Sequence, residues 1–177
     1  MIESEIILRI WKMDDLESLV RYAGNKAIWD NLTDAFPHPY TKEAGINYIR
    51  KASEDVPARI FAIEFQNEAV GSIGIFPDTD VYRKNAAIAY WVAEPFWGKG
   101  IATEAIRKMV KYAFATFDIA RIYARPFGKN VASHKVLEKA GFCLEGILIE
   151  TVLKNDVFLD EFIYAIRRQK AGASIDT

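Results

Sequence analysis

The chain has 177 residues, a mass of 20.1 kDa and 51% hydrophobic residues, which is enough for one sizeable core. Its net charge of −1 argues against general nucleic-acid binding, and it has no apolar run of the roughly 18 residues that a membrane span needs. Two histidines and one cysteine are too few for a structural zinc site or an internal disulfide. We therefore expect one domain over residues 1–177, without metal.

The N-terminal sequence MIESEIILRIWKMDD does not have the charged, apolar and cleavage regions of a signal peptide, so we expect a cytoplasmic protein. Cys143 is expected to be a small buried apolar residue. Residues 169–177, after Arg168, are expected to form a disordered tail.

The first half of the chain is predicted to alternate strands and helices around one proline-containing loop. The elements are a strand at 5–11, a helix at 13–24 opened by an Asp cap, a loop at 29–40 with one helical turn at its start as an alternative, a helix at 41–52 capped by Thr41, and strands at 59–65 and 69–76. The two strands are separated only by Gln66, Asn67 and Glu68, which predicts a hairpin.

The second half contains a strand at 86–93, a helix at 100–117, a strand at 120–127, a helix at 130–141 and a closing antiparallel pair at 142–155 and 157–167. Strand, helix, strand and helix with short links predict a parallel crossover inside an otherwise antiparallel sheet. The fold class is therefore α/β (α+β), with a mixed, mostly antiparallel sheet of about seven strands flanked by about four helices.

The stretch WVAEPFWGKGIATEAIRKMV, residues 91–110, passes from a strand through Pro95, Gly98 and Gly100 into a helix. The first turn of a helix leaves backbone N–H groups unpaired and carries roughly half a positive charge, and both features favour a phosphate. Glycines allow a ligand to approach the backbone closely. The alternative is that these glycines only form a tight turn.

Two common phosphate motifs do not match this stretch. A nucleotide P-loop needs four residues between its first Gly and a Gly-Lys-Ser/Thr sequence, which GKGIAT does not supply. The dinucleotide fingerprint needs a third glycine where Thr103 stands. Charge nevertheless points to an anion, because residues 97–139 contain nine Lys or Arg against three acids, a net +6, which leaves −7 for the rest of the chain.

WGKGIA resembles the Gln/Arg-x-x-Gly-x-Gly/Ala motif of the GNAT superfamily of N-acetyltransferases, with Trp97 where Gln or Arg is usual. Downstream, NVASHKVLEKAGF resembles the next motif of that superfamily, in which an Asn, here Asn130, contacts the pantetheine arm of the cofactor. The resemblance covers nearly the whole chain and is greatest to the Rim-type ribosomal-protein acetyltransferases. Either motif alone is weak, but the pair at this separation is specific.

The resemblance implies that acetyl-coenzyme A (acetyl-CoA) is the acetyl donor and that its pyrophosphate lies on the glycine turn, with the nucleotide near Lys129, Lys135 or Lys139. It also implies that an N–H group of the strand at 91–93 polarises the thioester carbonyl. The implied donor-binding residues are Trp91, Val92, Ala93, Trp97, Gly98, Lys99, Gly100, Ile101, Ala102, Thr103, Asn130, Ser133 and Lys135.

The candidate catalytic residues are Ser133 and Glu64. Many relatives protonate the leaving thiolate with a Tyr seven residues after the motif Asn, but Leu137 stands there, and Ser133 is the nearest hydroxyl. Rim-type relatives often carry a Glu on the central strand, where Ala87 stands here, so Glu64 is the substitute base. The alternatives are that Ser133 is a helix-cap serine and Glu64 a solvated acid on an alternating strand.

The absence of an obvious strong base favours an acceptor amine that is already neutral. An α-amine has a pKa of about 7.7–8.0 and a lysine side chain one of about 10.4, so an N-terminal α-amine is favoured over a free lysine. His38, Trp29, Phe36 and Tyr40 are expected to border the acceptor or, alternatively, to be solvated or to seal the core. The acidity outside residues 97–139 is also consistent with a polyamine.

Three functions remain open at this point. The first is an acetyl-CoA-dependent N-acetyltransferase acting on a primary amine. The second is a relative that binds acetyl-CoA without transfer, which the departures at Ala87, Trp97 and Leu137 keep open. The third is a plain nucleotide-binding enzyme that uses the glycine turn. Dimers are common among similar proteins, so a homodimer is one expectation.

Overall fold

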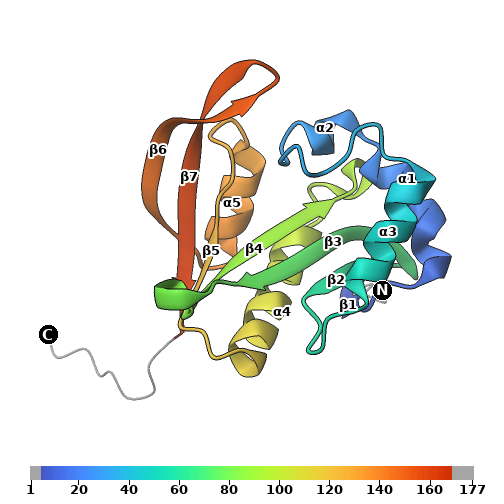
Figure 1. The fold of residues 1–177 in the computed structure, drawn as a ribbon, viewed down its shortest axis with the longest axis horizontal. Helices are drawn as coiled ribbons and strands as arrows, with labels where there is room; N and C mark the ends of the chain where they lie inside the picture. Colours follow the sequence, from blue (N-terminus) through green and yellow to red (C-terminus); the bar gives the residue numbers. More distant parts are fainter. Residues whose placement is uncertain (1–4, 169–177) are drawn as a thin grey trace, which may run out of the picture.

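The computed structural model describes residues 5–168, which form one seven-stranded sheet with helices on both faces (Figure 1). The strands are β1 (Ile7–Arg9), β2 (Ile60–Phe65), β3 (Glu68–Pro77), β4 (Asn85–Val92), β5 (Arg121–Ala124), β6 (Cys143–Lys154) and β7 (Val157–Arg167). The α-helices are α1 (Leu16–Ala23), α2 (Lys26–Trp29), α3 (Lys42–Ala52), α4 (Ile101–Thr116) and α5 (Val131–Lys139). Short 3-10 turns cover Met13–Asp15, Asp80–Tyr82 and Glu94–Phe96.

The strand order is β1-β2-β3-β4-β5-β7-β6, and only the β4–β5 pair is parallel. This confirms the predicted mixed sheet with one parallel crossover, which α4 makes. The predicted hairpin is also present, with Gln66 and Asn67 at positive φ angles of 54° and 63° between β2 and β3. Among the described residues, no helix is long and apolar enough to cross a bilayer.

Two hydrophobic clusters lie on opposite faces of the sheet. The larger one packs α4 against β3, β4 and β5 and includes Ile73, Ile106 and Met109. The other packs α1 and α3 against residues of β2, β3 and β4, including Ala62 and Trp91. Because side chains alternate along a strand, the two clusters hold β4 from both sides and fix its position at the centre of the molecule.

Several sequence expectations need correction. The helix expected at 13–24 is a 3-10 turn followed by α1. The helical turn considered at the start of the 29–40 loop is present slightly earlier, as α2, so there are five α-helices in the described residues against about four expected. The expected burial of Cys143 is wrong, because it is exposed at the start of β6, the edge strand of the sheet. The disorder expected for residues 169–177 lies outside the described residues.

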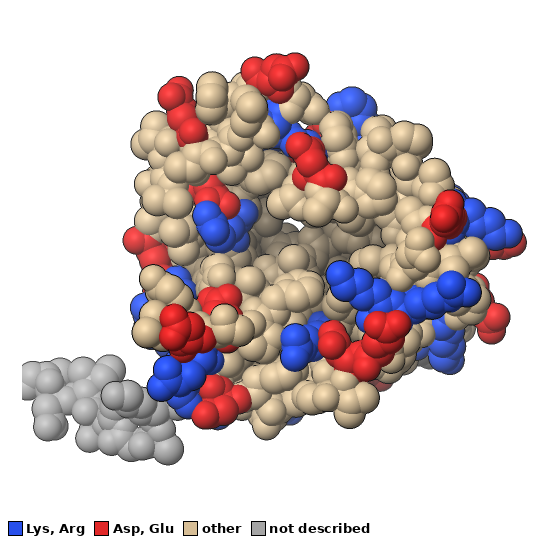
Figure 2. Space-filling view, in the orientation of Figure 1, with Lys and Arg blue, Asp and Glu red and all other residues tan. Residues whose placement is uncertain are grey.

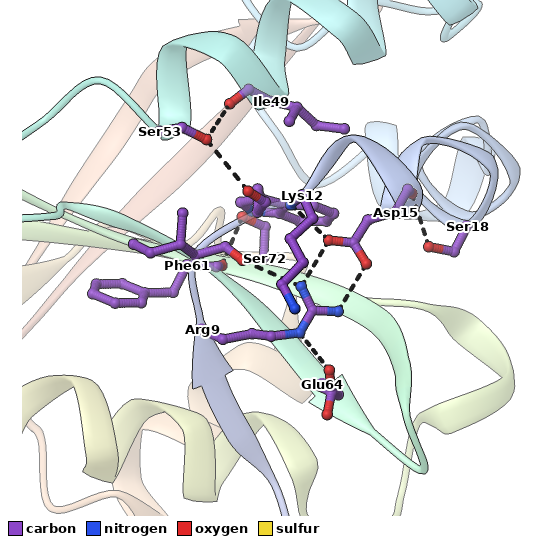
Figure 3. Close-up of polar contacts among 11 residues, drawn as sticks. Arg9, Lys12, Asp15, Ser18, Ile49, Ser53, Phe61, Glu64 and Ser72 are labelled. Atoms are coloured by element: carbon purple, nitrogen blue, oxygen red, sulfur yellow. Dashed lines mark hydrogen bonds and ion pairs between the residues drawn. The ribbon is translucent and has the colours of Figure 1, made fainter.

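An arginine ties the first strand to its neighbours (Figure 3). The Arg9 guanidinium donates two hydrogen bonds of 2.7 Å to the Asp15 carboxylate and also pairs with Glu64 of β2. Asp15 accepts a further bond of 2.8 Å from the Lys12 N–H. Burial opposes ionisation of Asp15, but the hydrogen bonds from Arg9 and Lys12 outweigh it and hold the pKa of Asp15 below its usual value. Glu64 is therefore part of a structural ion-pair cluster.

Candidate functional site

An open cavity of about 980 Å³ runs between the helix pair α4 and α5 and the segment containing α2 and α3. Figure 2 shows it as a hollow near the centre of the face, with uncharged inner walls and charged side chains on the rim. Its lining divides into two parts. The donor half comes from β4, the glycine turn, α4, the end of β5 and α5, and the acceptor half comes from residues 27–76.

The floor of the cavity is a gap in the sheet. β4 pairs with β5 only from Asn85 to Ala87, although β4 continues to Val92. The Ala93 N–H points the other way and donates to the Val70 carbonyl at 2.8 Å. Because successive residues of a strand point their backbone groups to opposite edges, Tyr90 and Val92 direct theirs toward the gap. This open edge is suited to pair with the amides of an extended ligand.

The glycine turn lies at one end of this edge. Gly98 and Gly100 have φ angles of 74° and 79°, and a Cβ built on either would meet nothing within 4 Å. The backbone bonds of α4 begin only at Glu104, whose N–H donates to the Gly100 carbonyl. Within residues 5–168, no acceptor is found for the backbone N–H groups of residues 98–103. The turn therefore presents a set of free donors with open space beside them.

Trp97, which stands where the resemblance leads us to expect Gln or Arg, contacts β4. Its indole N–H donates to the Val92 carbonyl at 2.6 Å, so it fastens the glycine turn to the end of β4. Lys99, by contrast, lies with its amino group 5.1 Å from the centre of the Phe96 ring and does not line the cavity. The positive charge at the donor half comes instead from four side chains, namely Arg125, Lys129, Lys135 and Lys139.

Two hydroxyl groups meet where β4 faces α5. The Tyr90 and Ser133 oxygens are 2.6 Å apart, and Asn130 caps α5 by accepting a bond of 3.2 Å from the Ser133 N–H. Burial raises the pKa of Tyr90 to about 12, so this phenol remains protonated at neutral pH. Sequence reasoning missed Tyr90. Its alternation with Ile88 and Val92 indicated the correct face of β4, but nothing in the sequence placed it beside Ser133.

The structure brings most of the predicted site residues into one cavity. The predicted residues that line it are Trp91, Val92, Trp97, Gly98, Gly100, Ile101, Ala102, Thr103, Asn130, Ser133 and Lys135. Three others do not line it. Ala93 directs its N–H to β3, Lys99 lies over Phe96, and Glu64 pairs with Arg9. Leu137, at the position of the usual Tyr, is fully buried in the core.

Apart from Lys51, the described residues of the acceptor half are uncharged, and several are aromatic. Phe36, Tyr40 and Tyr48 line it, and the Tyr48 hydroxyl lies 2.6 Å from that of Ser72. Among the described residues that line the cavity, in either half, none is Asp, Glu or His. The described lining therefore offers no carboxylate that could bind a cationic acceptor inside the cavity.

The β6–β7 hairpin contacts the segment around α2 beside the cavity. Lys154, at the end of β6, is buried, and its amino group lies 2.6 Å from Asp34 and 3.5 Å from the centre of the Trp29 ring. His38 stacks on the same Trp29 ring at 5.0 Å. Figure 1 shows the β6–β7 hairpin and α2 at the same end of the molecule. Trp29 and His38 thus support the rim and do not line the cavity.

Residues 5–143 match the acetyltransferase (GNAT) domain family, and the chain belongs to that family. It is 39% identical over 97 residues to the probable N-acetyltransferase YjcK of Bacillus subtilis, covering 55% of this chain and 54% of that one. It is 30% identical over 108 residues to the ribosomal-protein-serine acetyltransferase of Escherichia coli, covering 61% and 60%. These alignments span little more than half the length of either relative.

The solved structures agree over a longer stretch. Mycobacterium smegmatis RimJ, solved in complex with CoA-disulfide, superposes with a TM-score of 0.80 at 26% identity, covering 92% of this chain and 81% of that one. The strand order and the parallel crossover described above are therefore those of a GNAT domain.

Proposed function

We propose that the protein is an N-acetyltransferase that moves an acetyl group from acetyl-CoA to a primary amine by direct attack on the thioester. The observation that carries this proposal is the row of unpartnered N–H groups over residues 98–103, which lies beside the open edge of β4. The N–H groups suit a diphosphate, and the open strand edge suits the amides of a pantetheine arm. Their combination favours coenzyme A over a simple nucleotide.

Each part of the donor then has a partner in the cavity. The glycine turn would hold the pyrophosphate, and Lys129, Lys135 and Lys139 would attract the remaining phosphate charge. The open edge of β4 at Tyr90 would pair with the pantetheine amides, since the Val92 carbonyl already accepts the Trp97 indole N–H. The Val92 N–H is the candidate donor to the thioester oxygen, because the Ala93 N–H is already bonded to Val70.

In the proposed reaction, the neutral amine forms a C–N bond to the thioester carbon and the C–S bond breaks. The amine loses a proton to solvent, and the thiolate receives a hydrogen bond or proton. Ser133 is the proposed donor to sulfur, with Tyr90 hydrogen-bonded to it. If the Tyr90 hydroxyl donates to Ser133, the Ser133 hydroxyl hydrogen is free to point at the sulfur, and the chain of two bonds strengthens it as a donor.

The proposed acceptor is an N-terminal α-amine. None of the described residues that line the cavity is a carboxylate or an imidazole, so the lining offers no such group to deprotonate an ammonium group or to attract a polycation. At neutral pH, roughly a tenth or more of an α-amine is neutral, against under about a thousandth of a lysine side chain. The chemistry of the site therefore selects amines that are neutral before they react.

This selection predicts a pH dependence set by the acceptor. Below the pKa of the amine, kcat/KM should rise about tenfold per pH unit and then level off, near pH 8 for a peptide α-amine and near pH 10.4 for a lysine side chain. The measurement is kcat/KM against pH for two peptides, one with a free α-amine and one acetylated at its terminus with a free lysine. A common inflection for both acceptors would show that a group of the protein is the base.

The hydroxyl pair gives a second prediction. Ser133→Ala should lower kcat by roughly 10–100-fold with a smaller change in the KM for acetyl-CoA, because the lost interaction is made mainly as the thiolate departs. Tyr90→Phe should lower kcat less, since Ser133 remains. Tyr82→Phe is the matched control, because Tyr82 is exposed outside this cavity. Equal kcat in Ser133→Ala and wild type would exclude Ser133 as the donor.

The alternative is a module that binds acetyl-CoA without transferring its acetyl group. Glu64 pairs with Arg9 and does not line the cavity, and no described lining residue is Asp, Glu or His, which is consistent with this alternative. Calorimetric titration with acetyl-CoA and with ATP tests donor binding, and thiol release over a panel of peptide amines tests transfer. Binding of acetyl-CoA with no thiol release from any amine would favour the module.

A further inference from the structure

One face of α3 forms a wall of the acceptor half. Ala44, Asn47, Tyr48 and Lys51 all line the cavity, and their spacing places them on a single helical face. Tyr48 is fixed by its contact with Ser72, and burial raises its pKa, so it contributes an uncharged surface. Asn47 and Lys51 follow each other one turn apart along this wall.

Lys51 differs from the rest of this wall in its charge. Of the described lining residues contributed by positions 27–76, it alone carries a formal charge. Its side chain is exposed, and within residues 5–168 it has no ion pair or hydrogen bond. An unpaired ammonium group beside an amide side chain is a suitable partner for a carboxylate.

We propose that Lys51, together with Asn47, binds a carboxylate of the acceptor, so that the preferred substrate is a peptide with an acidic residue close behind its N-terminal amine. The inference rests on the proposed function and names the substrate class of the same site. The positive potential of Lys51 also disfavours a protonated amine nearby, which agrees with a site that takes neutral amines.

The alternative is that Lys51 only stabilises α3, and the test must distinguish this role from substrate binding. It lies in the last turn of α3, where a cation is favourable toward the negative end of the helix dipole. Arg50 shares that turn but is not among the residues that line the cavity. Arg50→Glu and Lys51→Glu therefore change net charge and helix dipole equally, and differ only in whether the change faces the acceptor.

The experiment compares three C-terminally amidated tetrapeptides that begin with alanine and carry Glu, Gln or Lys at the second and third positions. We expect kcat/KM, from thiol release, to fall from the Glu to the Gln to the Lys peptide by about two- to fivefold at each step, the range of exposed ion pairs. High salt should shrink the differences. Lys51→Glu should reverse the order, whereas Arg50→Glu should keep it.

A second readout does not depend on turnover. The Kd of each peptide for the protein loaded with CoA, measured by calorimetry, should follow the same order and the same dependence on Lys51. Equal kcat/KM for the three peptides, or equal effects of the two substitutions, would overturn the inference. If no peptide is acetylated but the Glu peptide still binds through Lys51, the proposed function fails and the carboxylate site stands. Acetylation of free glutamate but not of the Glu peptide would contradict the peptide substrate, and the acceptor would then be an amino acid whose carboxylate Lys51 binds.

Discussion

Replacing Gly100 by Asp is expected to abolish binding of acetyl-CoA while the fold survives. A side chain at this position enters open space next to the free N–H groups of the glycine turn, where the diphosphate is proposed to lie. Two unit charges about 4 Å apart repel by about 4 kcal/mol at an effective dielectric constant near 20. The Kd for acetyl-CoA, measured by calorimetry, should therefore rise at least about 100-fold.

Two control variants separate charge from backbone strain. Gly100→Ala imposes the same φ of 79° without a carboxylate, so it should cost about 1 kcal/mol of stability and weaken binding much less. Gly146→Asp adds the same charge at a position on β6 where a side chain also meets open space, away from the cavity. An unchanged Kd in Gly100→Asp would rule out the glycine turn as the diphosphate site.

Replacing Arg9 by Met is expected to lower the free energy of unfolding by about 3 kcal/mol, because it leaves two carboxylates in a largely buried place without their shared cation. The Arg9, Asp15 and Glu64 side chains are only 19%, 10% and 18% exposed. For a chain of this size, the loss corresponds to a fall in Tm of about 6–12 °C, measurable by calorimetry. Arg21→Met is the control, since Arg21 is 61% exposed and its contact with Glu68 is 3.5 Å, so it should cost under about 1 kcal/mol.

The stability lost in Arg9→Met is expected to depend on pH. The pKa of Asp15 is held below its usual value in the folded protein, so its ionised form stabilises the fold at any pH above about 4, the value in the unfolded chain. This stabilisation is lost as the pH falls through the lowered pKa. The difference in unfolding free energy between wild type and Arg9→Met should therefore be full at neutral pH and shrink in acid. A difference that is constant down to low pH would contradict the assignment.

The sequence was sufficient for the parts of the site that are local along the chain. The glycine turn at the start of α4 depends on residues a few positions apart, so their spacing was informative, whereas the cap that Asn130 forms on α5 was not predicted. The strands along the chain and the single parallel crossover followed from alternation and short links, but the order of the strands in the sheet was not predicted. These features are set by backbone geometry, which composition and spacing reflect directly.

Partners that are distant in sequence could not be predicted in this way. Tyr90 and Ser133 are 43 positions apart in the sequence, and their contact was not predicted. Arg9 and Glu64 are 55 positions apart, so their ion pair was not predicted either, and Glu64 was predicted as a base. The burial predicted for Cys143 was wrong for a related reason. Its apolar neighbours suggest burial, but β6 is an edge strand with exposed residues such as Ile149. An alternating pattern shows which face a residue is on but does not show what lies opposite.

The gap between β4 and β5 has one further consequence under the proposed function. The backbone groups of Tyr90 would recognise the pantetheine arm, which the acetylated donor and the spent thiol have in common. Contacts of that kind are made equally before and after transfer, so they do not distinguish reactant from product. Turnover would then respond to the ratio of acetyl-CoA to free CoA around the protein, and accumulating CoA would act as a competitive inhibitor.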